Sequence, residues 1–144
     1  MQERPTVLCA DDDPTILAVS RYILEASGYL VITAEDGAEA VDLARSKSID
    51  LALLDIKMPG MSGIEVLEVL KADDADFYAI MVTSVEDIGI TLDAMGKGAC
   101  DYIGKPIDAR QLLSSVKQAL ELRRVNQAGA AQPQSEKWAR RPGH

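Results

Sequence analysis

Polar side chains that could do chemistry together follow four short apolar runs of this 144-residue sequence. Asp11, Asp12 and Asp13 follow the first run, Asp55 follows Leu51–Leu54, and Thr83 and Lys105 follow two later runs. Carboxylates that lie close together repel one another, and a hard divalent cation relieves that repulsion. Mg²⁺ binds a few carboxylate oxygens and keeps open positions that phosphoryl oxygens can fill. The pattern therefore predicts a Mg²⁺ site if the fold brings these residues together.

The four groups differ in what each could contribute to phosphoryl transfer. A carboxylate such as that of Asp55 can act as the nucleophile and form an acyl phosphate. Lys105 supplies a compact positive charge, and Thr83 supplies a hydroxyl donor. Phosphoryl transfer needs mainly positioning and charge neutralisation from a protein. These residue types are the ones such a site needs.

Apolar runs alternate with segments of helical period along residues 6–122, which predicts five strands and five helices. The expected strands are 6–10, 30–34, 51–54, 78–82 and 101–103, and the expected helices are 14–27, 38–44, 64–70, 87–95 and 108–125. Such βα alternation predicts a doubly wound α/β fold with a parallel sheet, here a flavodoxin-like (βα)5 fold with strand order 2-1-3-4-5. In that order the first and third strands are neighbours. Asp11, Asp12 and Asp55 would then converge at the carboxyl edge of the sheet.

Helix and loop signals at the boundaries support this arrangement. Asp13 precedes Pro14, a combination typical of a helix N-terminus, so Asp13 is better explained as a helix cap than as a metal ligand. Pro59 and Gly60 predict a loop directly after Asp55. The apolar residues Ile88, Leu92 and Met95 are expected in the core on the buried side of the fourth helix, rather than in a groove for a partner.

Composition excludes several classes of function. The net charge of −8 argues against direct nucleic-acid binding by the folded part. No apolar run approaches 18 residues and no secretory signal is evident, so a cytoplasmic protein without membrane contact is expected. The only histidine is His144, which removes histidine-based zinc sites and a phosphohistidine relay within this chain. Cys9 and Cys100 are expected to be small buried apolar residues rather than a disulfide.

Over residues 5–125 the sequence resembles the receiver domain of two-component response regulators. Four segments carry the resemblance in order: Val7 to Pro14, Leu53 to Gly63, Val82 to Ser84, and Gly98 to Pro106. The resemblance implies a signalling domain rather than an enzyme, with only self-phosphorylation and autodephosphorylation chemistry. A sensor histidine kinase or histidine phosphotransfer protein would donate the phosphoryl group, and a downstream effector protein would read the result. A homodimer through the fourth helix, fifth strand and fifth helix is also implied.

The resemblance also implies a role for each site residue. Asp55 would accept the phosphoryl group, with Mg²⁺ held by Asp12 and Asp55 directly, by Asp11 through water, and by the backbone carbonyl of Lys57. Thr83 and Lys105 would hold the phosphoryl oxygens. Tyr102 would be a switch aromatic that turns inward as Thr83 moves toward the phosphate. Lys105-Pro106 would be a cis peptide bond.

Two alternatives remain open at this point. Asp11-Asp12-Asp13-Pro14-Thr15 fits the Asp-x-Asp-x-Thr motif of haloacid-dehalogenase-type Mg²⁺-dependent phosphatases, in which Asp11 would be the nucleophile and Asp13 the general acid. That hypothesis leaves Asp55 and its Pro-Gly loop unexplained.

Residues 126–144, which include Trp138, are expected to form a flexible tail or linker. The chain could be a single-domain regulator or the receiver of a longer protein.

Overall fold

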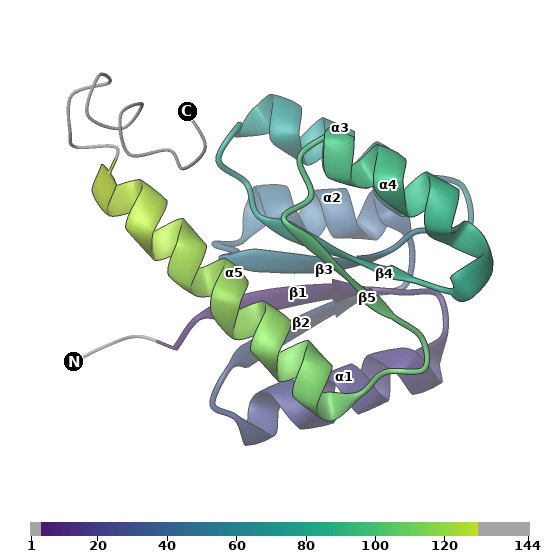
Figure 1. Cartoon of the computed structure of the whole chain (residues 1–144), viewed down its shortest axis with the longest axis horizontal. Helices are drawn as coiled ribbons and strands as arrows, with labels where there is room; N and C mark the ends of the chain where they lie inside the picture. Colours follow the sequence, from purple (N-terminus) through teal and green to yellow (C-terminus); the bar gives the residue numbers. More distant parts are fainter. Residues whose placement is uncertain (1–3, 130–144) are drawn as a thin grey trace.

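The computed structural model describes residues 4–129, apart from the side chains of Val85, Ile88 and Ala128. Strands and helices alternate along this part of the chain (Figure 1). The strands are β1 (Thr6–Ala10), β2 (Leu30–Ala34), β3 (Leu51–Asp55), β4 (Ala79–Thr83) and β5 (Asp101–Gly104). The helices are α1 (Pro14–Ala26), α2 (Gly37–Ser46), α3 (Gly63–Asp73), α4 (Ile88–Gly96) and α5 (Ala109–Gly129), with a 3-10 turn at Val85–Asp87.

All five strands are parallel and lie in the order β2-β1-β3-β4-β5, which confirms the predicted fold. The register aligns Ala10 with Leu54, Asp55 with Val82, and Thr83 with Gly104. The last residues of β1, β3, β4 and β5 therefore meet at one edge of the sheet. Because a parallel sheet keeps its strands about 4.8 Å apart, side chains just beyond these ends can touch.

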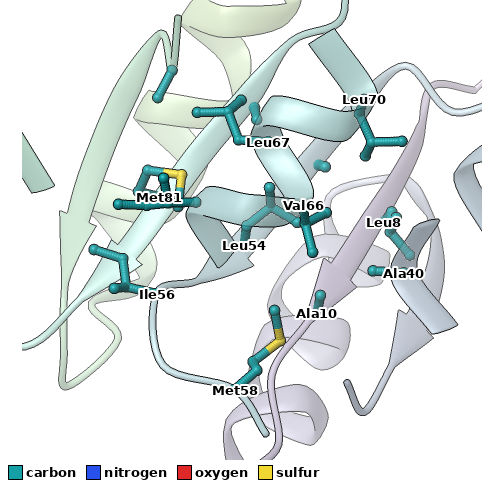
Figure 2. Close-up of a cluster of buried hydrophobic side chains, with 14 of the residues drawn as sticks. Leu8, Ala10, Ala40, Leu54, Ile56, Met58, Val66, Leu67, Leu70 and Met81 are labelled. Carbon is teal, nitrogen blue, oxygen red and sulfur yellow. The ribbon is translucent and has the colours of Figure 1, made fainter. Parts of the chain in front are cut away.

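Helices cover both faces of the sheet, with α1 and α5 on one face and α2, α3 and α4 on the other (Figure 1). Successive residues of a strand point to opposite faces, and the two cores follow this alternation. Leu8, Leu54 and Met81 pack beneath α2 and α3 (Figure 2), whereas Val7, Leu53 and Ile80 pack against α1 and α5. Every residue of β3 and β4 is buried, so these strands form a rigid base for the groups at their ends.

Side chains cap several helices, and Asp13 does so as the sequence predicts. The Asp13 carboxylate accepts a hydrogen bond from the Thr15 backbone N–H at 2.9 Å and caps α1. The Ser62 hydroxyl and the Glu65 carboxylate form a reciprocal capping box at the start of α3.

Cys9 is buried, Cys100 is half-buried, and both thiols are free. The side chain of Leu92, expected on the buried side of α4, is 64% exposed instead, because the face of α4 that packs inward carries Thr91 and Ala94.

Helix α5 runs further than the sequence suggests and ends at Gly129, so residues 126–129 of the predicted tail are helical. Its last turns are attached to the amino end of the sheet, where an Arg123 guanidinium nitrogen lies 3.2 Å from Asp50 Oδ1 and the Asn126 amide donates to the Tyr78 hydroxyl. Trp138 and the rest of the predicted tail lie outside the described residues. In the described part of the chain, no helix has both the length and the apolar character that crossing a bilayer requires.

Candidate functional site

Three aspartates meet at the carboxyl edge of the sheet. Asp11 follows β1, Asp12 is the next residue, and Asp55 is the last residue of β3. One carboxylate oxygen from each lies within 4.8 Å of the others. The Asp11 and Asp55 residues are only 3% and 5% exposed, whereas Asp12 is exposed to solvent. The strand order therefore produces the convergence of carboxylates expected from the sequence.

Lys105 bridges the two buried carboxylates. Its ammonium nitrogen lies 3.1 Å from Asp11 Oδ2 and 3.2 Å from Asp55 Oδ1. Its backbone N–H donates to the carbonyl of Thr83 at 2.8 Å, and the Lys105-Pro106 peptide bond is cis, as expected. Burial acts to lower the pKa of this lysine, but the contacts with Asp11 and Asp55 outweigh burial and leave its pKa raised. Lys105 therefore stays positively charged at neutral pH.

One lysine does not compensate this concentration of negative charge. Burial, and then the charge of Asp11, raises the pKa of Asp55 to about 6, although Lys105 acts in the opposite direction. Asp11 Oδ2 is buried and, within residues 4–129, has no partner in hydrogen-bonding geometry even though the lysine nitrogen is near. The raised pKa of Asp55 and the unpartnered oxygen of Asp11 both indicate that a further positive charge would be stabilised at this edge of the sheet.

The donor set suits Mg²⁺. All three candidate ligands are hard oxygen atoms of the kind that Mg²⁺ prefers, and they lie within 4.8 Å of one another. The unpartnered oxygen of Asp11 is a buried acceptor that a metal-bound water could satisfy. The residues present therefore fit the cation that the sequence predicts.

The loop after Asp55 is held close to the end of β3. The Gly63 backbone N–H donates to the Ile56 carbonyl at 3.0 Å, and the Met58 side chain is buried beneath the loop. A β-carbon on Gly63 would lie 2.1 Å from the carbonyl oxygen of Asp55, so only glycine fits there. Gly60 has a φ of +77°, which favours glycine in the turn. The sequence indicated the loop but not this close approach.

Lys57 reaches across the mouth of the site to a residue that the sequence did not single out. Its ammonium nitrogen lies 3.1 Å from Asp87 Oδ1, and Asp87 also accepts a hydrogen bond from the Ser84 hydroxyl at 2.8 Å. The bonds from Ser84 and Lys57 hold the pKa of Asp87 below its usual value. The bond from Asp87 raises the pKa of Lys57. These side chains, with Asp12 and Lys105, line an open pocket above Asp55.

Thr83 and Tyr102 lie on neighbouring strands but point to different places. The Thr83 hydroxyl is buried and lies 2.8 Å from the hydroxyl of Thr91 on α4. Tyr102 is 42% exposed, with its side chain at the surface. Thr91 was not predicted from the sequence, in which the one available signal is a threonine between the apolar residues Ile90 and Leu92 of a helix.

The chain belongs to the response regulator receiver domain family, whose model matches residues 7–117. It is 39% identical over 120 residues to the C4-dicarboxylate transport transcriptional regulatory protein DctD of Pseudomonas aeruginosa, covering 83% of this chain and 26% of that protein. It is 37% identical over 114 residues to the alkaline phosphatase synthesis transcriptional regulatory protein PhoP of Bacillus subtilis, covering 79% of this chain and 48% of that protein. This chain thus spans about half or less of these relatives.

Solved structures of isolated receiver domains match over nearly their whole length. A CheY-like receiver domain protein from Methanospirillum hungatei is 35% identical with a TM-score of 0.77, covering 86% of this chain and 99% of that one. A receiver domain protein from Clostridium thermocellum is 30% identical with a TM-score of 0.80, covering 84% and 98%. The phosphatase alternative built on Asp11 and Asp13 is not supported, since the matching family and fold are those of receivers.

Membership of this family defines the class of function. Receiver domains of response regulators are signalling domains that generally lack enzyme activity and bind Mg²⁺ at an acidic pocket. Response regulators interact with histidine kinases and with downstream effectors.

Proposed function

We propose that this chain accepts a phosphoryl group on Asp55 from a histidine kinase or a histidine phosphotransfer protein, in a reaction that depends on Mg²⁺. The observation that carries the proposal is the position of Asp55. It ends a buried central strand, with two other carboxylates within 4.8 Å and the Lys105 ammonium at 3.2 Å. Asp55 is the member of that group that ends the central strand β3, at the edge where ligand sites of parallel α/β sheets lie.

The chemistry follows from what each side chain can do. Mg²⁺, when held by Asp11, Asp12, Asp55 and the backbone carbonyl of Lys57, would neutralise charge on the phosphoryl oxygens. A carboxylate oxygen of Asp55 attacks phosphorus, the P–N bond of the donor phosphohistidine breaks, and the imidazole leaves with the electron pair. With a pKa of about 6, Asp55 is mostly ionised at neutral pH and competent as a nucleophile. The family's Mg²⁺ pocket supports the metal assignment to Asp11, Asp12 and Lys57.

Lys105 and Thr83 would hold the product. The Lys105 ammonium already contacts Asp55 and needs only a small shift to pair with a phosphoryl oxygen. The Thr83 hydroxyl would leave its present partner and donate to another phosphoryl oxygen. Tyr102, exposed in this unphosphorylated chain, would then turn inward beside β4.

The proposed output surface is formed by α4, β5 and α5, which lie next to one another (Figure 1). Large apolar side chains are exposed on each of these elements, namely Ile90, Leu92, Tyr102 and Leu122. An effector protein or a second copy of the chain would cover them. We further propose that the receiver domain spans residues 5–125 and acts in the cytoplasm. We also propose that it does not contact DNA directly, which the acidic composition supports.

The test is to locate the phosphoryl group. The purified chain is incubated with Mg²⁺ and a small phosphodonor such as acetyl phosphate, and the hydroxylamine-labile label is mapped by mass spectrometry. We expect one label, on Asp55, which is lost on chelation of Mg²⁺ and in Asp55→Asn. Asp36→Asn, which changes a half-buried aspartate that caps α2 and does not line the pocket, should label like the wild type. Label on Asp11, or full labelling of Asp55→Asn, would contradict the proposal.

A further inference from the structure

A buried pair of hydroxyl groups joins β4 to α4 beside the site. Thr83 is the last residue of β4 and Thr91 lies in the middle of α4, and their Oγ1 atoms are 2.8 Å apart. The Thr91 residue is only 1% exposed. Two oxygen atoms at this distance need a proton between them, so the two hydroxyls are hydrogen-bonded to each other.

The Thr83–Thr91 bond holds the Thr83 hydroxyl toward α4 whichever of the two hydroxyls is the donor. The Thr91 hydroxyl also lies 2.9 Å from the carbonyl of Asp87, and the Thr83 hydroxyl lies 3.1 Å from the carbonyl of Ser84. Each hydroxyl donates one hydrogen bond. Either Thr83 donates to Thr91, which donates to Asp87, or Thr91 donates to Thr83, which donates to Ser84. In both arrangements Thr83 stays bonded to Thr91.

We propose that Thr91 is a positioning residue for Thr83, which it holds away from Asp55 until the phosphoryl group arrives. This inference rests on the proposed function, in which Thr83 donates to a phosphoryl oxygen. If Thr83 turns to donate to that oxygen, its bond with Thr91 breaks. The Thr83–Thr91 bond therefore stabilises the unphosphorylated arrangement and opposes the phosphorylated one.

Breaking the Thr83–Thr91 hydrogen bond would affect the position of α4. Thr91 shares its hydroxyl between Thr83 and the carbonyl of Asp87, whose carboxylate contacts Ser84 and Lys57. Loss of Thr83 as a partner leaves the Thr91 hydroxyl bonded only to the Asp87 carbonyl at the start of its own helix, so α4 loses its hydrogen bond to β4 at this position. The exposed Leu92 follows Thr91 directly, so a shift of α4 moves part of the proposed output surface.

The matched variants are Thr91→Val, which keeps the shape and removes the hydroxyl, and Thr91→Ser, which keeps the hydroxyl. The probe is beryllium trifluoride with Mg²⁺, a mimic of the phosphoryl group on a carboxylate. Because one hydrogen bond typically contributes about 0.5–1.5 kcal/mol, Thr91→Val should bind the probe roughly 2- to 10-fold more tightly than the wild type. Thr91→Ser should bind like the wild type. If Thr91→Val folds poorly, Thr91→Ala replaces it.

A second pair of variants separates positioning from a general effect on α4. In the Thr83→Ala background the hydroxyl to be released is absent, so Thr91→Val should no longer change the affinity for the probe. Equal affinity in wild type and Thr91→Val, or the same gain in both backgrounds, would overturn the inference. Failure of every variant to bind the probe would instead overturn the proposed function. In that case the role of Thr91 is tested by the χ1 rotamer of Thr83, measured by NMR without Mg²⁺. We expect a single Thr83 rotamer in the wild type and several in Thr91→Val. Identical rotamers in the two proteins would refute the positioning role of Thr91.

Discussion

Gly63 at the start of α3 packs so tightly against Asp55 that a β-carbon there would lie 2.1 Å from the Asp55 carbonyl oxygen. Since the clash is with backbone, Gly63→Ala must displace either α3 or the end of β3. We expect it to lower the free energy of unfolding by about 1–3 kcal/mol, the usual cost of overpacking, and to reduce labelling of Asp55. Denaturant unfolding and phosphodonor labelling measure the two effects.

Gly89 is the matched control for that substitution. It lies in α4 with open space around it and no positive φ. Gly89→Ala should therefore stabilise the protein by about 0.5–1 kcal/mol through helix propensity. If both alanine variants changed the free energy of unfolding alike, the close approach of Gly63 to Asp55 would not be the cause of the destabilisation.

Asp55 should destabilise the metal-free fold at neutral pH. Its pKa is raised from 3.8 to about 6, chiefly by burial and then by Asp11, so the folded protein binds the extra proton more tightly than the unfolded chain. Stability from this group is full below pH 4 and is lost as the pH rises toward 6. Asp55→Asn should raise the free energy of unfolding at pH 7 by about 1–3 kcal/mol. Urea unfolding of both proteins without Mg²⁺, at pH 4 and pH 7, should show the gain at pH 7 only. An equal gain at both values would place its origin elsewhere.

Asp12 offers the cleanest test of metal binding, because its exposed side chain has little packing to lose. Asp12→Asn should weaken Mg²⁺ affinity on the order of 10-fold or more, measured by calorimetry or by the Mg²⁺-dependent rise in the unfolding midpoint. Asp13→Asn is the control, since asparagine also caps a helix well and Asp13 serves α1 as its cap. Equal Mg²⁺ affinity in the two variants would argue against a role for Asp12 as a ligand.

The ion pair between Lys57 and Asp87 crosses the mouth of the pocket and should hinder attack by water on phosphorylated Asp55. The Lys57 side chain is exposed although Asp87 is buried, so the pair should contribute on the order of 1 kcal/mol, and Lys57→Gln should speed loss of the phosphoryl group by about 5-fold. Phosphate release after removal of the donor measures the rate. Lys97→Gln breaks a 3.1 Å pair with Glu68 away from the pocket and should leave the rate unchanged. A slower rate in Lys57→Gln would contradict the prediction.

The fold could be predicted from local patterns because each strand is a short apolar run and each boundary carries its own signal. β1 and β2 begin and end where the sequence places them, and Asp13 and Ser62 cap the helices that they precede. β3 extends one residue further, through Asp55, because that residue still pairs with Val82. The parallel order then brings Asp11 and Asp55 to one edge without any detailed knowledge of the side chains.

The contacts that could not be predicted from the sequence depend on how α4 packs against β4. The bonds of Thr91 to Thr83 and of Asp87 to Lys57 join residues whose approach is fixed by the position of α4. That helix has weak amphipathic patterning, so periodicity placed Leu92 wrongly on the buried side and missed Thr91, although Met95 packs against the core as expected. The tight contact at Gly63 likewise depends on backbone proximity, which no side-chain pattern records.

Helix α5 carries the chain to the end of the molecule opposite Asp55, where Arg123 and Asn126 attach it beside the amino ends of the strands (Figure 1). A surface tether or fluorescent label placed after Gly129 would thus leave the entrance for a phosphodonor facing free solution. Copies immobilised through the end of α5 should exchange phosphoryl groups with a kinase as readily as free ones, which makes Gly129 a suitable point of attachment for binding assays.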